Sequence, residues 1–149
     1  MDCEPRSIST RYNPAVDDAA IEQALRTFFQ TGGPEVSAAY LFGSVARGTS
    51  GTTSDVDVGV LLARPPADGL AGLPLDLEAD LERLLGVPAQ VIVLNRAPVD
   101  LVHRVLRDGK LLVDRDPAGR IAFEVRARNE FFDLKPVLDQ YRAVRGPDR

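Results

Sequence analysis

The segment from Ala39 to Leu62 constrains the fold of this chain most strongly, because two strand-like apolar runs flank a polar turn within it. The first run ends at Gly43-Ser44, and the second begins with Asp55 and Asp57. Side chains at positions i and i+2 of a strand project from the same face, so these two carboxylates are expected side by side. The sequence therefore predicts two neighbouring strands with a polar site where they meet the loop.

The chemistry of this segment favours a bound cation and a bound phosphate. Carboxylates this close raise each other's pKa unless a cation offsets their charge. Mg²⁺ prefers carboxylate oxygens together with substrate phosphates, so Asp55 and Asp57 are predicted to bind it. Gly43 lets the backbone approach a phosphate, and a short helix from Ser44 to Arg47 would point free N–H groups at that anion. The alternative without a functional site is an ordinary Gly-Ser turn beside two solvated charges.

The sequence LFGSVARGTSGTTSDVDVGVLL resembles the signature of the minimal nucleotidyltransferases of the DNA polymerase β superfamily. The match is close over residues 40–62 and looser, in the order of elements, as far as Arg145. It implies transfer of a nucleoside monophosphate from a nucleoside triphosphate such as ATP to a hydroxyl, which needs mainly positioning and charge neutralisation. The resemblance assigns catalysis and Mg²⁺ binding to Asp55 and Asp57, and nucleotide binding to Gly43, Ser44, Arg47, Thr53 and Ser54.

One position departs from the family pattern. The family presents a third carboxylate from the following strand, which completes a second metal site or activates the attacking hydroxyl. Here that strand, residues 89–94, has Gln90 at the position expected to be acidic. A glutamine can orient a group, but it cannot serve as a base. Both a transferase and a module that binds nucleotide or a partner without chemistry therefore stay open.

Length and composition set further bounds. A chain of 149 residues is expected to form one domain with a real core. Its net charge of −4 argues against broad nonspecific binding of nucleic acid. Cys3 is the only cysteine, so no intrachain disulfide can form. Without a signal peptide or an apolar run of about 18 residues, the chain is predicted to be cytoplasmic and to have no membrane partner.

The pattern of apolar residues predicts an α/β (α+β) domain of the nucleotidyltransferase fold, with a small mixed sheet flanked by helices. Residues 1–14 are predicted to be a mobile N-terminus, and 15–149 a single nucleotidyltransferase domain. Helices are expected near 15–31, 77–85 and 98–108, strands at 36–42, 55–62 and 89–94, a loop at 64–72, and a short edge strand at 110–113. A long C-terminal helix should span 117–145, with Pro136 bending or breaking it near Lys135.

Three functions compete. The tail EVRARNEFFDLKPVLDQYRAVR resembles the C-terminal helix of antitoxin-like minimal nucleotidyltransferases, which adenylylate a HEPN-type toxin partner, here expected on a tyrosine within a hetero-oligomer. A small-molecule enzyme resembling aminoglycoside nucleotidyltransferases is the second, but those enzymes carry a further helical domain. The third is an antitoxin that neutralises its partner by contact alone, which Gln90 favours.

The remaining polar and aromatic residues have blander interpretations. His103 is expected on the surface, Tyr40 in core or edge packing, and Asp76, Glu78 and Asp80 on a solvated helix face. The alternating arginines and acids of the last helix predict ion pairs on an exposed face. Its apolar residues exceed what one short domain needs to bury, which predicts partner docking; they are Phe131, Phe132, Leu134, Leu138 and Tyr141.

Overall fold

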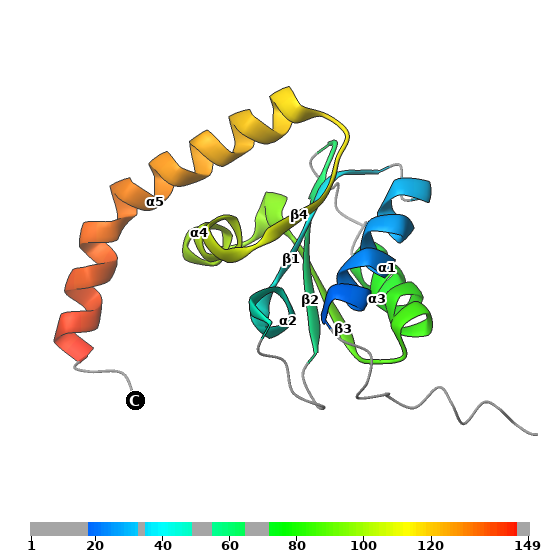
Figure 1. The fold of residues 1–149 in the computed structure, drawn as a ribbon. Coiled ribbons are helices and arrows are strands. Elements are labelled where there is room, and N and C mark those ends of the chain that lie inside the picture. Colours follow the sequence, from blue (N-terminus) through cyan, green and yellow to red (C-terminus); the bar gives the residue numbers. More distant parts are fainter. Residues whose placement is uncertain (1–17, 33–34, 49–54, 65–71, 146–149) are drawn as a thin grey trace, which may run out of the picture.

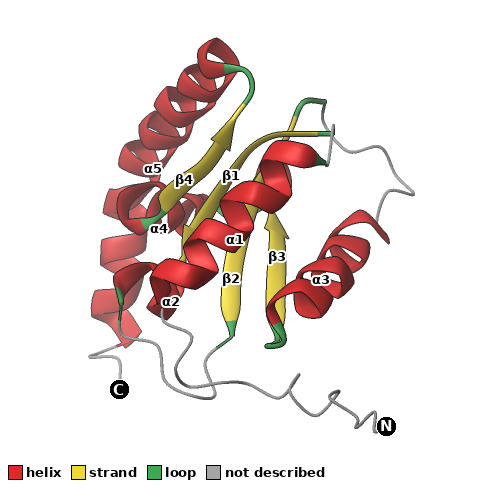
Figure 2. Cartoon of the chain, turned by 45° about the vertical axis from the view of Figure 1, so that its right-hand side comes forward, coloured by secondary structure: helices red, strands yellow, loops and turns green. Residues whose placement is uncertain are grey.

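A four-stranded mixed sheet in the order β3-β2-β1-β4 separates two layers of helices (Figures 1 and 2). Its strands are β1 (Val36–Phe42), β2 (Val56–Leu62), β3 (Ala89–Val93) and β4 (Lys110–Asp114). β1 pairs antiparallel with both β2 and β4, while β2 and β3 are parallel. The computed structural model describes residues 18–32, 35–48, 55–64 and 72–145. The predicted mobile segment 1–14 therefore lies outside the described residues, and the predicted mixed sheet is confirmed.

Helices cover both faces of the sheet (Figure 2). α1 (Asp18–Thr31) and α3 (Gly72–Leu85) lie on one face, and α4 (Val99–Asp108) and α5 (Pro117–Arg145) on the other. The short α2 (Gly43–Arg47) follows β1, and the 3-10 turn η2 (Leu94–Arg96) follows β3. The predicted order of elements is confirmed with small shifts, since Asp55 precedes β2 and Leu94 belongs to η2. None of the helices in the described ranges is both long and apolar enough to cross a membrane.

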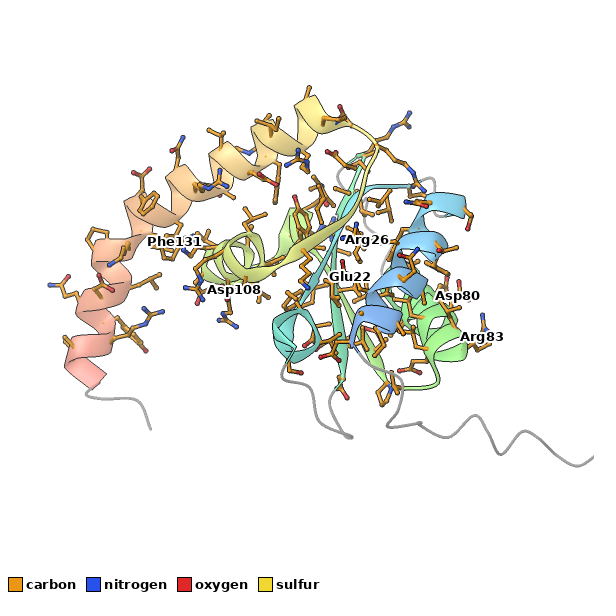
Figure 3. The ribbon with its side chains drawn as sticks, in the orientation of Figure 1. Glu22, Arg26, Asp80, Arg83, Asp108 and Phe131 are labelled. Carbon is orange, nitrogen blue, oxygen red and sulfur yellow. The ribbon has the colours of Figure 1, made fainter. Side chains whose placement is uncertain are left out.

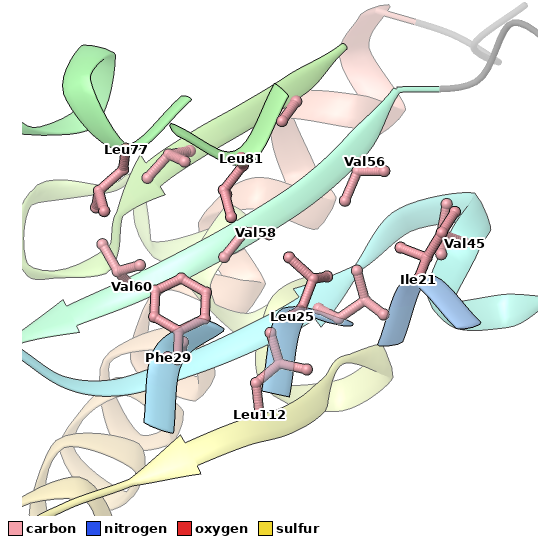
Figure 4. Close-up of a cluster of buried hydrophobic side chains, with 14 of the residues drawn as sticks. Ile21, Leu25, Phe29, Val45, Val56, Val58, Val60, Leu77, Leu81 and Leu112 are labelled. Atoms are coloured by element: carbon pink, nitrogen blue, oxygen red, sulfur yellow. The ribbon is translucent and has the colours of Figure 1, made fainter. Parts of the chain in front are cut away.

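The two faces of the sheet build two separate cores. β1 is buried along its whole length because it lies in the middle of the sheet with helices on both sides. Alternate residues of β2 divide between the layers, so that Val56, Val58 and Val60 pack towards α1 and α3 (Figure 4), whereas Leu61 packs towards α4 and α5. The period-2 alternation of a strand therefore places Asp57 on the α4 and α5 side.

The outer edge of β3 is closed by carboxylates of α3. The Val91 N–H donates to Glu78 Oε2 at 2.8 Å, and the Ala89 N–H donates to Glu82 Oε2 at 3.1 Å. An edge strand otherwise presents unpaired backbone groups to solvent and to other chains. The interpretation of Glu78 as part of a merely solvated face was wrong, because its carboxylate satisfies a backbone donor of the sheet.

Arg115, directly after β4, ties this end of the sheet to the end of α1. Its guanidinium donates to the carbonyls of Phe29, of Gly32 at 2.6 Å and of Val36 at 2.8 Å. The last carbonyls of a helix have no intrahelical donor, and a cation at that end also complements the helix dipole. Arg115 thereby holds the C-terminal end of α1 against the start of β1.

A polar network joins α5 to the sheet. The buried Tyr40 of β1 donates its hydroxyl to Glu124 Oε2 at 2.8 Å. Arg120 bridges Glu124 Oε2 and Asp114 Oδ2, each at 2.9 Å. The predicted ion pairs of α5 are thus present, but Arg120 and Glu124 are mostly buried rather than exposed. Packing of Tyr40 in the core, which was predicted, is confirmed.

Pro136 was expected to bend or break α5; the helix is continuous and changes direction in its C-terminal half, so it is bent rather than broken (Figure 1). One expectation about α4 is corrected. His103 of α4 is half-buried rather than a simple surface residue, since its ring stacks on Phe131 with centroids 3.6 Å apart and planes 3° from parallel. An aromatic stack of this kind is worth about 0.5–1.5 kcal/mol beyond its buried area.

We predict that Tyr40 ionises only when the protein unfolds. Burial and the Glu124 carboxylate raise the pKa of the Tyr40 hydroxyl well above its usual range. Because the folded-state pKa is the higher one, this group contributes stability that is present below about pH 10 and lost as the pH rises above it. In an ultraviolet titration, Tyr40→Phe should remove one tyrosine that ionises late. Denaturant unfolding at pH 7 should show a free energy of unfolding that is lower by about 1 kcal/mol. An unchanged late absorbance step in Tyr40→Phe would contradict this.

Candidate functional site

The sheet register brings the predicted site residues to one end of the sheet. Phe42 at the end of β1 lies opposite Asp57, and Asp57 lies opposite Gln90 of β3. Residues directly opposite each other in a sheet share a face, so Asp57 and Gln90 lie on the same side. Asp55 lies immediately before β2, two residues ahead of Asp57, and is exposed, whereas Asp57 is half-buried. Gln90 thus takes the position, beside the aspartate pair, at which the resemblance implies a third carboxylate.

Gly43 lies directly against the Asp57 carboxylate. A Cβ built on Gly43 would overlap Asp57 Oδ2 and lie 3.2 Å from its Cγ. The backbone of Gly43 also has a φ of 82°, which side chains other than hydrogen disfavour. Both the available space and the backbone conformation therefore require glycine at this position. The backbone that follows β1 contacts the Asp57 carboxylate with no side chain between them.

α2 presents its N-terminal end at the same place. Phe42 occupies the N-cap with extended backbone angles and has no side-chain oxygen to accept from the first N–H groups. Val45 and Ala46 are buried and anchor the turn, and Gly48 closes it with a left-handed φ of 73°. The short helix predicted from Ser44 is confirmed as Gly43–Arg47. The predicted contacts of the Arg47 side chain, Thr53 and Ser54 fall outside the described residues and stay predictions.

Two cations near this end of the sheet pair with one carboxylate of α1. Lys110 pairs with Glu22 of α1 at 3.2 Å, and Arg26 pairs with the same carboxylate at 2.6 Å (Figure 3). The hydrogen bond from Arg26 lowers the pKa of Glu22. These two cations are therefore held by α1 rather than directed at the aspartates.

The donor set suits a hard cation bound together with a ligand. Asp57 of β2 and Asp55, two residues before it, supply the oxygen donors that Mg²⁺ prefers, and the bare backbone at Gly43 leaves Asp57 Oδ2 next to the turn. Within the described residues no group of three or more His, Cys, Asp or Glu side chains could hold a metal. Mg²⁺ in such sites is commonly bound through one or two carboxylates together with substrate phosphates.

A separate cavity of about 240 Å³ lies elsewhere in the domain. Leu94, Asn95 and Val102 line it from one side, and Phe123 and Ala127 of α5 from the other. Leu94 and Asn95 follow the end of β3, whereas Gln90 lies near its start. This cavity is therefore not part of the aspartate site.

Two positions that support the sheet were not predicted. Gly109, between α4 and β4, lies so close to the end of β1 that an added Cβ would be 3.2 Å from the Leu41 carbonyl oxygen. Asn95 pairs with both backbone groups of Leu62, accepting from its N–H at 2.8 Å and donating to its carbonyl at 3.3 Å. A glycine and an asparagine directly beside strands were the available signals, but both are equally common in plain turns.

Residues 23–118, more than half of the chain, match the family model described as polymerase beta, nucleotidyltransferase. The chain belongs to this nucleotidyltransferase family. The resemblance predicted from residues 40–62 is thus confirmed over a much longer stretch. A comparison with curated proteins found no significant match to the chain.

Solved structures share the nucleotidyltransferase fold of this chain. A chain from a toxin–antitoxin structure with AMP-PNP is 24% identical, with a TM-score of 0.63 over 80% of this chain and 97% of that one. A chain from the toxin–antitoxin complex MntA–HepT is 20% identical, with a TM-score of 0.60 over 83% and 97%. A chain from a complex of tri-AMPylated Shewanella oneidensis HEPN toxin with an MNT antitoxin is also 20% identical, with a TM-score of 0.60 over 83% and 98%.

We predict that the nucleotidyltransferase site does not tolerate a methyl group at residue 43. Gly43→Ala and Gly48→Ala both force alanine into a left-handed backbone, at about 1–3 kcal/mol each. Only the first also displaces Asp57, because a Cβ at residue 48 would meet nothing within 4 Å. Calorimetric titration with ATP and Mg²⁺ should therefore find binding weakened about tenfold or more in Gly43→Ala and little changed in Gly48→Ala. Equal losses in the two variants would refute the contact.

Proposed function

We propose that this chain is an Mg²⁺-dependent adenylyltransferase that moves AMP from ATP to a tyrosine hydroxyl of a HEPN-type toxin and thereby acts as its antitoxin. The observation that carries the proposal is the Asp57 carboxylate lying against the bare backbone of Gly43, with Asp55 two residues before it, immediately ahead of β2. Family membership and the fold shared with chains from toxin–antitoxin complexes support it. A hetero-oligomer with the toxin in the cytoplasm follows from the same proposal.

The chain's own residues would act mainly by positioning. Asp55 and Asp57 would hold Mg²⁺, which neutralises triphosphate charge when bound. The Gly43 backbone and the Ser44 hydroxyl would hold the β- and γ-phosphates, leaving the α-phosphorus facing the acceptor. The acceptor oxygen then bonds to the α-phosphorus. The bond between that phosphorus and the oxygen that bridges the α- and β-phosphates breaks, and pyrophosphate leaves with the electron pair.

Gln90 bears on the choice of acceptor. The attacking hydroxyl must lose a proton, and a glutamine beside Asp57 cannot take it. A tyrosine hydroxyl, with an ordinary pKa of about 10, ionises far more readily than an aliphatic hydroxyl and therefore depends less on a base. The missing carboxylate thus favours tyrosine among the hydroxyl acceptors.

Gln90 also favours a second function, in which the chain neutralises its partner by contact and its nucleotide site is vestigial. The two functions differ in one measurable product. Intact-mass measurement of the purified HEPN-type partner, after incubation with this chain and ATP, should show the gain of adenylyl groups. A partner that is neutralised while its mass stays unchanged would establish the contact function and refute the transferase.

We predict that ATP with Mg²⁺ stabilises the fold. A ligand at a hundred times its Kd contributes about 2.7 kcal/mol, which corresponds to a rise in Tm of roughly 5–10 °C for a domain of this size. Asp55→Ala/Asp57→Ala should abolish that rise, because the carboxylates that hold the cation are lost. Thermal scans with and without nucleotide measure it. The same rise in the double variant would place the ATP site elsewhere.

We also predict that Gln90→Asp accelerates transfer. A carboxylate in register with Asp57 would supply a metal ligand or a base, and general-base assistance alone is typically worth 10²–10⁴-fold. Gln90→Asn is the matched control, since it shortens the side chain equally without adding charge. Initial rates of partner adenylylation at saturating ATP distinguish the two variants. If Gln90→Asp were no faster than Gln90→Asn while binding ATP normally, another group would be serving that role.

A further inference from the structure

One side of α5 carries a regular apolar stripe. Its residues recur at intervals of three and four, the spacing of positions a and d in a heptad, and two more fall at the adjacent position e. A stripe of this width is what a helix buries when it packs in a bundle. We call these residues the α5 stripe: Ala127, Phe131, Leu134, Val137, Leu138, Tyr141 and Val144.

The domain covers only the first part of the α5 stripe. Ala127 is 6% exposed and belongs to the core, and Phe131 is half-buried against His103 of α4. Further along, Val137 is 58% exposed, Tyr141 59% and Val144 83%. Leu134 and Leu138 of the stripe are half-buried, so the strongly exposed members are Val137, Tyr141 and Val144 in the C-terminal part of the helix.

This uncovered part gains little stability from contacts within α5. The ion pairs of Asp139 with Lys135 and Arg142 are of the kind worth about 0.2–0.5 kcal/mol each. Pro136 removes a backbone hydrogen bond inside the helix, at a cost of about 3 kcal/mol. Isolated helices shorter than about 12–15 residues are only marginally stable in water. Burial of the stripe against a partner is therefore the contribution that would stabilise this segment as a helix.

We propose that the α5 stripe beyond Phe131 docks an amphipathic helix of the acceptor protein, on the basis of the proposed function. The heptad spacing fits a helix, and the covered part of the stripe already packs against one, α4, which ends at Asp108. The acceptor helix extends that interface along α5, beyond the part that α4 covers.

The course of α5 selects the acceptor as the occupant. Its C-terminal half descends to the end of the molecule at which α2 and the start of β2 lie, as Figures 1 and 2 both show. A helix bound there lies at the same end as Asp55 and Asp57. Docking and delivery of the hydroxyl are then a single event, and no further domain of this chain is needed to form an acceptor site.

The test compares two valines of the same helix. Val137→Glu places a charge on the stripe, whereas Val125→Glu places the same charge on another side of α5, at a position 48% exposed. With the purified HEPN-type protein as probe, Val137→Glu should weaken the complex roughly tenfold or more, and Val125→Glu should leave it unchanged. Both variants should keep the wild-type Tm and the rise in Tm with ATP. Tyr141→Ala, a second change on the stripe, should also weaken the complex.

The outcomes separate this proposal from the proposed function. If wild type and Val137→Glu bind and adenylylate the probe equally, the docking surface lies elsewhere and the transferase stands. If the wild type binds through the stripe but adds no AMP, docking stands and the transferase fails. Sedimentation of the chain alone provides a third result, since a dimer that Val137→Glu dissociates would mean that a second copy covers the stripe.

Discussion

The pairing of β1 with β2 in the register that sets Phe42 opposite Asp57 is the interaction on which the candidate site depends. A slip of one residue would turn every side chain of β2 to the other face. Asp57 would then enter the apolar layer under α1 and α3, and Val58 would take its place beside the turn. Burial of both faces of β1 makes such a slip costly, so the core that stabilises the domain also fixes the position of the carboxylate.

The sequence could predict that the parts of the candidate site meet at one end of the sheet, because they are close along the chain. Gly43 directly follows β1 and Asp57 belongs to β2, the next strand along the chain. Residues two apart in a strand share a face, which predicted that Asp55 and Asp57 lie side by side. The position of Gln90 beside Asp57 was predicted from the family pattern, and the register of β2 with β3 agrees with it. What the pattern could not convey is the contact itself, since nothing in a Gly-Ser pair says that its Cα will meet a carboxylate.

Contacts between distant segments could not be predicted. Arg115 reaches carbonyls of residues more than eighty positions away, and Glu78 finds a backbone donor on a strand that follows its own helix. Periodicity reports only that such polar residues avoid the core, which solvent exposure satisfies equally well. His103 was misjudged for the same reason, because Phe131 lies on a helix whose course depends on the whole sheet.

The strand order has a consequence for synthesis of the chain. β1 is central, yet its second neighbour, β4, begins at Lys110, long after β1 and β2 have left the ribosome. Until then the nascent sheet ends at β1, with a row of unpaired backbone groups along an almost wholly apolar strand. Such an edge is a template for pairing with other chains. β1 is therefore open to pairing with other chains until β4 has been synthesised.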